Sequence, residues 1–280
     1  MLTLPARTPT YGCRLRAWYD CGMVAFYLPG STPVNVYSVF VALGACLGLA
    51  WVAWRAGPKA AMRQVEAGMW VLLGALVGSR ALYVAVSWLY YKDHLLESLQ
   101  FFRGGLGWPG ALAGGLLALA GFAALNHISL AELADSLVPL LAALSVSAWL
   151  GCWAAGCAYG IASNDWWSLP APDEWGVITN RWPVQILGAL LTVGWFALVE
   201  SLAGPARLKP GYRALLSLLG LSLILLAAAW LRADPGFSLN GMRLEAWAAL
   251  AYSLLALAGL VGLYFRQARA KQEKLEDTPV

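Results

Sequence analysis

Long apolar runs follow one another along almost the whole chain, and they constrain the fold more than any other feature of the sequence. About seven of them reach the roughly 20 residues that a helix needs to cross the hydrocarbon core of a bilayer. They lie at approximately Val34–Trp54, Gly68–Tyr90, Leu106–Leu125, Leu137–Ile161, Val184–Leu202, Ala214–Leu231 and Ala246–Phe265. The runs are continuous rather than alternating, so a β-barrel is disfavoured and the spans are expected to be helical.

The composition agrees with a membrane protein. Hydrophobic residues make up 60% of the 280 residues and charged residues only 12%, whereas soluble domains are usually about one quarter charged. We therefore predict an all-α, polytopic integral membrane protein with about seven transmembrane helices and no nucleic-acid partner. Its parts are an interfacial arm (1–33), the transmembrane domain (34–265) and a charged tail (266–280). The arm has no uninterrupted apolar core, so it is not predicted to be a signal peptide.

Basic residues set the expected orientation. Positive charges favour the cytoplasmic side of a membrane. They cluster in three places: after the first run, between the fifth and sixth runs, and in the tail. If the chain crosses the membrane seven times, these three places lie on the same side. The residues are Arg55, Lys59, Arg63, Arg207, Lys209, Arg213, Arg266, Arg269, Lys271 and Lys274. We predict an outside N-terminus and a cytoplasmic C-terminus, although the basic N-terminal arm opposes this orientation.

Arg80 is the most informative single residue because it lies within the second run. A guanidinium at the bilayer centre costs about 2.5 kcal/mol or more unless it faces a pocket or a partner. One interpretation is structural: an ion pair with Asp135 that joins two helices. The other is functional: contact with a phosphate or carboxylate, whose geometry suits the arginine fork. Arg103, followed by Gly104 and Gly105, favours a headgroup-facing segment nearby.

The run from Asp135 to Gly160 holds one carboxylate and two thiols, Cys152 and Cys157. Five residues on a continuous helix correspond to about 500° of rotation, so these thiols are expected on faces about 140° apart unless the helix breaks. That spacing predicts no metal site, and no cofactor is expected. A bridge between Cys13 and Cys21 on the outer side remains open.

The order of the motifs resembles the prolipoprotein diacylglyceryl transferase family from about Val24 to Phe265. The matching segments are VAFYLPG, VNVYSV with Tyr37, GSRALYV with Arg80, GGLGWPGALAGG, DSLVP with Asp135, WLGCWAAGCAYG, NRWPVQ with Arg181 and Gln185, and LRADP with Arg232. The cysteine pattern is most similar to a cysteine-containing branch of the family. The resemblance implies a multi-pass enzyme of the prokaryotic cytoplasmic membrane. Such an enzyme transfers diacylglyceryl from phosphatidylglycerol to the lipobox cysteine of a prolipoprotein and releases glycerol phosphate.

The resemblance also implies the site. Asp135 and Arg181 would be catalytic, the lipid would lie near Tyr37, Arg80, Arg103, Gly104, Gly105, Trp149 and Gln185, and Cys152, Cys157 and Arg232 would stand close by.

This sequence departs from the family's motifs at several of its polar positions. Pro109 stands at the family's histidine, a proposed base, and Trp149 at its phosphate-binding arginine. Trp182 and Gly188 replace a further histidine and a glutamate. Two hypotheses follow: a divergent transferase, or a catalytically inactive lipid-binding homologue or accessory subunit on the same scaffold.

Overall fold

The computed structural model describes residues 24–28, 32–100, 105–173, 177–206 and 208–276. Most of the predicted N-terminal arm, including Cys13 and Cys21, lies outside these ranges, as do Arg103 and Gly104. The expectations that rest on those residues are therefore not addressed by the structure.

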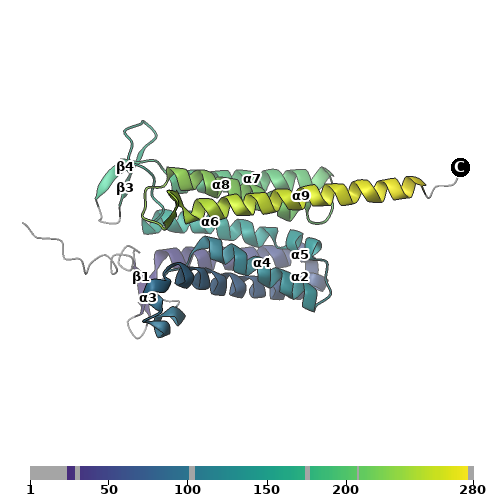
Figure 1. The fold of residues 1–280 in the computed structure, drawn as a ribbon, viewed down its shortest axis with the longest axis horizontal. Coiled ribbons are helices and arrows are strands. Elements are labelled where there is room, and N and C mark those ends of the chain that lie inside the picture. The colour runs from purple at the N-terminus through teal and green to yellow at the C-terminus, as the bar shows by residue number, and fades with distance from the viewer. Residues whose placement is uncertain (1–23, 29–31, 101–104, 174–176, 207, 277–280) are drawn as a thin grey trace, which may run out of the picture.

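The described chain is a bundle of long helices with short strand hairpins. The helices are α2 (Val36–Val86), α3 (Trp88–Tyr91), the 3-10 helix η2 (Leu95–Leu99), α4 (Trp108–Leu125), α5 (Leu130–Ser136), α6 (Val138–Ala155), α7 (Val184–Ala206), α8 (Tyr212–Leu231) and α9 (Leu244–Glu276). The strands are β1 (Val24–Leu28), β2 (Thr32–Asn35), β3 (Leu169–Pro172), β4 (Ile178–Arg181), β5 (Ser238–Leu239) and β6 (Met242–Arg243), and each consecutive pair forms an antiparallel hairpin. Figure 1 shows the long helices running along the molecule's long axis.

Helix α2 folds back on itself at Gly57, which has a φ of 68°. A side chain on Gly68 would meet Cδ2 of Leu49 at 2.6 Å. In one straight helix, those two residues would be roughly 28 Å apart, so α2 makes two passes. Six helices among the described residues are long and apolar enough to span a membrane. With the second pass of α2 this gives seven passes, and the predicted all-α polytopic membrane fold is confirmed.

The first predicted span ends too early. The polar segment after Trp54 is helical on both sides of the break at Gly57, since residues such as Lys59, Arg63 and their alanine neighbours favour helix even outside an apolar run. Pro109 does not interrupt α4. It lies in the first turn of α4, where the missing N–H has no intrahelical acceptor to lose.

Glycines bring the helix backbones into direct contact. A side chain on Gly78 of α2 would lie 2.7 Å from Cα of Gly114 in α4, and one on Gly48 would lie 2.9 Å from Cα of Leu140 in α6. Small residues at this spacing are typical of membrane helices, whose association depends on close packing rather than on exclusion of water. The glycine-rich start of α4 therefore serves packing at Gly110 and Gly114.

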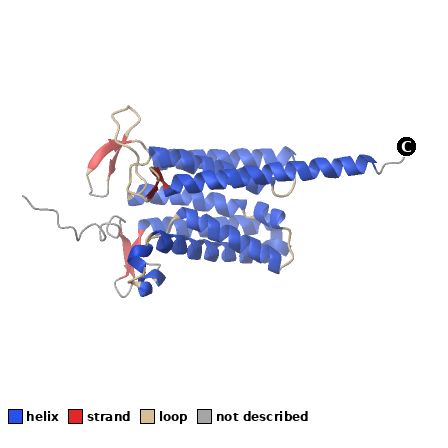
Figure 2. Cartoon of the chain, viewed as in Figure 1, coloured by secondary structure: helices blue, strands red, loops and turns tan. Residues whose placement is uncertain are grey.

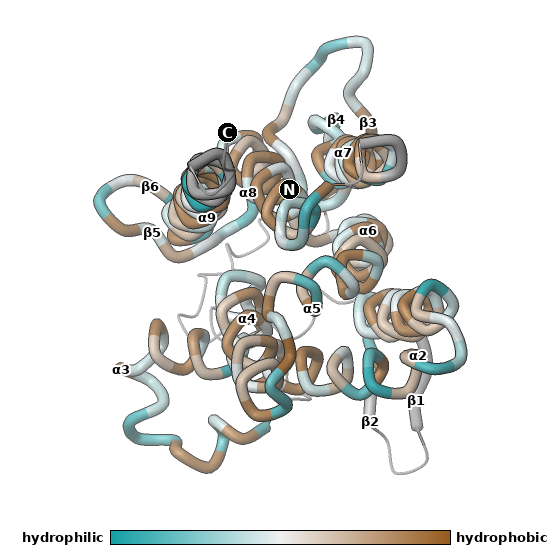
Figure 3. The backbone as a smooth tube through the Cα atoms, turned by 90° about the vertical axis from the view of Figure 1, so that its right-hand side faces the viewer, coloured by the Kyte–Doolittle hydropathy of each residue, from teal (hydrophilic) through white to brown (hydrophobic). Residues whose placement is uncertain are grey.

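The end-on view in Figure 3 separates the helices into two groups, with α2, α3 and α4 on one side, and α7, α8 and α9 on the other. Helix α6 packs against both α2 and α7 and joins the groups. All the strands gather at one end of the bundle, as Figure 2 shows. We call this the hairpin end; the opposite end carries α5 and the turn of α2.

Basic residues predicted to share one side do meet at the opposite end. Arg55 from α2 and Arg213 from α8 both contact the carboxylate of Glu200 in α7, with Arg55 Nη1 at 2.8 Å from Oε2. The extended last helix α9 leaves the bundle in the same direction (Figure 1).

Candidate functional site

The candidate site begins where α6 ends. Gly156 adopts a left-handed conformation (φ 70°, ψ 21°), and the N–H of Cys157 donates to the carbonyl of Cys152 at 2.9 Å. A bond across five residues with glycine in this conformation is the Schellman ending of a helix. The predicted span to Ile161 is therefore about six residues too long, and residues 156–161 form a non-helical segment at the hairpin end.

The helix ending brings the two thiols together. The sulfur of Cys157 lies 2.6 Å from that of Cys152, and both side chains are partly buried. The expectation that they face apart applied only to a continuous helix, and the helix ends between them. The Cys152 thiol lowers the pKa of Cys157, and the guanidinium of Arg232 lowers it further, while burial acts in the opposite direction.

Arg181 closes strand β4 and points its guanidinium at this segment. Its side chain is buried, lies 4.6 Å from the ring centroid of Tyr159, and contacts the carboxylate of Asp173 at 3.3 Å. The buried Nε of Arg181 has no hydrogen-bond partner among the described residues. Gln185, one turn into α7, donates to the carbonyl of Cys157 at 2.8 Å.

Arg232 follows α8 directly and belongs to an ion network. It makes a bidentate contact with Asp234 at 2.8 and 2.6 Å and reaches Glu245 at 3.3 Å. Arg243 contacts the same two carboxylates at 3.4 and 3.1 Å. Sequence reasoning identified Arg232 but missed its partners. The signal was present: an arginine stands two residues before an acid at both 232–234 and 243–245.

Arg80 forms a second cluster at the same end. Its Nε and Nη2 donate to the carbonyls of Ser98 and Glu97 at 2.8 and 2.6 Å, and its guanidinium lies 5.3 Å from the ring of Tyr91. A side chain on Gly105 would meet Arg80 Nη1 at 2.9 Å. Arg80 therefore holds η2 and the start of the α4 segment against α2.

Aromatic rings connect the two clusters. Tyr83, one turn after Arg80, packs edge-on against Phe237, which lies in the segment between Arg232 and Arg243. Tyr37 in the first turn of α2 lies against Gly151, the residue before Cys152. Four of the predicted site residues therefore lie at the hairpin end: Tyr37, Arg80, Arg181 and Arg232.

Asp135 lies elsewhere. Its two carboxylate oxygens accept hydrogen bonds from the backbone N–H groups of Gly211 and Ala214, both at 2.7 Å. This contact is at the N-terminal end of α8, whereas Arg232 is at the other end, roughly 30 Å away along a helix of that length. The ion pair between Arg80 and Asp135 does not form, and the carboxylate instead caps α8 at the opposite end.

The residues that depart from the family's motifs, Trp149, Gly188 and Pro109, contact specific neighbours. The indole of Trp149 lies on Gly188, where a side chain would meet its ring at 2.6 Å, and it is buried with Val184, Ala189 and Ala228. The carbonyl of Pro109 accepts a hydrogen bond of 2.6 Å from the hydroxyl of Tyr252 in α9. Trp149 and Gly188 therefore form one complementary pair, a relation that their separation in sequence conceals.

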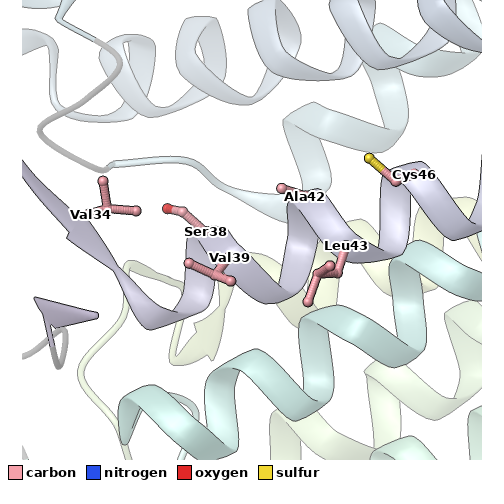
Figure 4. Close-up of a pocket in the computed structure, with 6 residues that line it drawn as sticks. All are labelled: Val34, Ser38, Val39, Ala42, Leu43 and Cys46. Carbon is pink, nitrogen blue, oxygen red and sulfur yellow. The ribbon is translucent and has the colours of Figure 1, made fainter. Parts of the chain in front are cut away.

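An apolar groove of about 440 Å³ follows the first pass of α2. It is lined at helical spacing by Val34, Ser38, Val39, Ala42, Leu43 and Cys46, as Figure 4 shows. In the described part of the chain, no three His, Cys, Asp or Glu side chains group together as metal ligands would.

Comparison with known proteins places the chain in a family. The family model for prolipoprotein diacylglyceryl transferase matches residues 23–264, which include every helix described above except the last turns of α9. The chain belongs to the prolipoprotein diacylglyceryl transferase family. The resemblance drawn from the motifs is thus confirmed, and the match covers both arginine clusters and the cysteine pair.

Similar proteins carry one name. A protein of Thermosynechococcus vestitus is 27% identical over 263 residues, covering 87% of this chain and 96% of that protein. One of Trichormus variabilis is 29% identical over 217 residues, with 72% and 75% covered. One of Bacillus licheniformis is 32% identical over 130 residues, with 45% and 47% covered. Each is named phosphatidylglycerol–prolipoprotein diacylglyceryl transferase. The chain is therefore a multi-pass membrane protein whose relatives are bacterial.

Proposed function

We propose that this protein is a phosphatidylglycerol–prolipoprotein diacylglyceryl transferase whose reaction takes place at the hairpin end. The observation that carries the proposal is Arg181: a buried guanidinium with one N–H lacking a partner, inside a region that matches the family throughout. Buried donors in proteins nearly always have a hydrogen-bond partner, so this N–H is free to bind a ligand. A phosphate oxygen would satisfy this one.

In the proposed reaction, a thioether bond forms between the prolipoprotein cysteine and the diacylglyceryl carbon, and the bond from that carbon to the phosphate oxygen breaks. The leaving glycerol phosphate keeps the electron pair, so a cation at the phosphate stabilises the transition state. The thiol must lose its proton, because the thiolate is the nucleophile. We propose Asp173, which contacts Arg181, as the acceptor of that proton.

The remaining predicted residues fit roles in lipid binding. Tyr37, Arg80, Gly105 and Gln185 would surround the headgroup, with Trp149 behind them, and the family resemblance adds Arg103 and Gly104. The groove along α2 is apolar and starts one turn from Tyr37, so we propose it for an acyl chain. Asp135 has no part in this proposal because it caps α8 at the far end.

Complementation tests the activity. The protein is produced in bacteria depleted of their own transferase, and a reporter lipoprotein is examined for diacylglyceryl modification by mass spectrometry. Modification above the vector background is expected. Its absence, with the protein present in the membrane fraction, would favour the inactive lipid-binding homologue or accessory subunit, an alternative that the comparisons do not support.

Two variants test the assignment of the arginines. Arg181→Gln is expected to lower the transfer rate by about 10² or more, the usual effect of removing a transition-state donor. Arg63→Gln is the matched control, since Arg63 is exposed and lies six residues after Gly57, at the turn of α2. Arg80→Ala is expected to reduce co-purification of anionic phospholipid. Unchanged lipid retention would leave Arg80 with a packing role only.

We also propose that the protein lies in the cytoplasmic membrane with the hairpin end outside and the C-terminus inside. The basic residues at the opposite end support this orientation. A fluorescent protein that matures only in the cytoplasm, fused after Val280, is expected to be fluorescent. A fusion of periplasmic alkaline phosphatase at the same point is expected to be inactive, and the reverse pattern would invert the orientation.

A further inference from the structure

We propose that Cys152 and Cys157 form a reversible intramolecular disulfide, and that its oxidant is another disulfide, either of a small thiol or of a thiol oxidoreductase. The proposal assigns a modification site at the end of α6. It goes beyond diacylglyceryl transfer and does not depend on it.

The distance between the thiols is the first support. The two sulfurs lie 2.6 Å apart, and a disulfide bond is about 2.05 Å long. The sulfurs therefore need to approach by only about half an ångström to reach bonding distance. Cys46, the other cysteine among the described residues, lies on the exposed groove of α2 and is not paired with them.

The backbone is built for this approach. On a continuous helix the two side chains would point to different faces. Here Gly156 is left-handed, and the N–H of Cys157 donates to the carbonyl of Cys152. This helix ending turns the Cys157 thiol back toward Cys152. Gln185 holds the same turn from α7 by donating to the carbonyl of Cys157. Two helices thus fix the pair before any bond forms.

The surroundings favour thiol–disulfide exchange. A thiolate is the attacking species, and a nearby cation stabilises it. Arg232 at the end of α8, which forms a backbone bridge with Gly160, supplies that charge, opposed by the Asp234 carboxylate. Both cysteines are intermediate in exposure rather than fully buried.

The exchange balances as follows. The Cys157 thiolate attacks the incoming disulfide, forms a mixed disulfide and releases one thiolate. Cys152 loses its proton and attacks the Cys157 sulfur, which forms the internal bond and releases the second thiolate. The pair loses two electrons and two protons, and the incoming disulfide is reduced to two thiols.

Oxidation would covalently hold the segment that orients Arg181. The carbonyl of Gly160 lies 3.5 Å from Arg181 Nη1, and the ring of Tyr159 lies beneath the same guanidinium. Both residues follow Cys157 within three positions. The bond would therefore restrain Arg181 through its neighbours.

Differential alkylation of the purified, full-length protein tests the proposal. A single tryptic peptide, Gly104 to Arg181, contains both thiols and no other cysteine. The native protein is equilibrated with oxidised glutathione, denatured, alkylated without reduction, and digested. The peptide is expected to carry no alkyl group and to gain two after treatment with dithiothreitol. Two alkyl groups before reduction would overturn the proposal.

Two variants separate this pair from other chemistry. In Cys46→Ser the peptide should remain protected as in the parent protein. In Cys152→Ser the remaining thiol should become alkylated or carry glutathione, and it should never be protected as an internal bond. Protection that survives Cys152→Ser would also overturn the proposal. The readout on the parent protein needs no variant to fold, and it is independent of the transferase assay.

Discussion

At the scale of single residues, Trp149 and Gly188 are best understood as one unit. The indole occupies the space that a side chain on Gly188 would need, with its nearest ring atom 2.6 Å from that position. The sequence shows two unrelated departures from the family's motifs, and only the packing of α6 on α7 shows that they compensate each other.

This pairing predicts the effect of Gly188→Ala. The added methyl must displace a buried ring, and overpacking of this kind typically costs about 1–3 kcal/mol. The thermal unfolding midpoint in detergent should fall accordingly, and the loss should shrink in a Trp149→Leu background because the two sites interact.

Gly194→Ala is the control for this experiment. Gly194 lies in the same helix, and a side chain there would meet no atom within 4 Å. The midpoint of Gly194→Ala should stay near that of the parent protein. Equal losses in both glycine variants would contradict the pairing.

Individual site residues were predictable where their chemistry is unusual for their depth. Arg80 was identified because a charge within an apolar run needs a partner, and the structure places it with carbonyls and aromatic rings rather than with Asp135. Asp135 shows the limit of that reasoning. A polar residue in an apolar stretch can serve a helix end as well as a reaction, and its partners, Gly211 and Ala214, are more than 70 residues away in sequence.

At the scale of elements, the ends of the helices are the features that were hardest to predict from the sequence. Helix runs were predictable from continuous apolar length, but the break at Gly156 was not, because a glycine inside an apolar run usually serves packing in membrane helices. The strands β3 and β4 were equally unpredicted; they form between two of the apolar runs.

Gly156→Ala should weaken the proposed disulfide. The left-handed backbone at position 156 would be strained by about 1–2 kcal/mol with alanine in place of glycine. The added methyl itself has room, because its nearest neighbour is Pro172 at 3.6 Å. Relief of that strain would move Cys157 away from Cys152. In a series of glutathione redox buffers, half-oxidation of the peptide that carries both thiols should require more oxidising conditions.

Gly121→Ala is the matched substitution for that measurement, since Gly121 lies within α4, and no atom would contact its added methyl. Its redox midpoint should equal that of the parent protein. If Gly156→Ala behaved in the same way, the helix ending would not be what positions the thiols.

The cap of α8 predicts a pH dependence. Burial raises the pKa of Asp135 above its ordinary value of 3.8, although the amides of Ala214 and Gly211 and the charge of Arg213 act to lower it. The folded state therefore holds this proton more tightly than the unfolded state. The contribution of Asp135 to stability should fall as the pH rises from 3.8 through the higher folded pKa, and then level off.

Asp135→Asn removes this titration. Unfolding midpoints of both proteins across a pH range of about 4 to 7 should show the parent losing stability relative to the variant as the pH rises. A constant difference between the two proteins over that range would show that the carboxylate titrates as it does in the unfolded chain.

At the scale of the whole molecule, one carboxylate connects the two helix groups at the end opposite the hairpins. Glu200 of α7 contacts Arg55 of α2 at 2.8 Å, and it also pairs with Arg213 of α8. Glu200→Gln should lower the free energy of unfolding by about 1.5–3 kcal/mol, the range for hydrogen bonds to charged groups. Chemical denaturation in detergent measures it.

Glu132→Gln provides the comparison, because Glu132 is exposed on α5. Its substitution should leave the denaturation curve unchanged. A loss confined to Glu200→Gln would establish that the contact holds the helix groups together, whereas no loss in either variant would show that packing through α6 is sufficient.

The turn at Gly57 has a consequence for biosynthesis. Because Leu49 and Gly68 touch across it, the two arms of α2 can enter the bilayer as one helical hairpin rather than one after the other. The unit that the insertion machinery accepts is then the hairpin from Val36 to Val86.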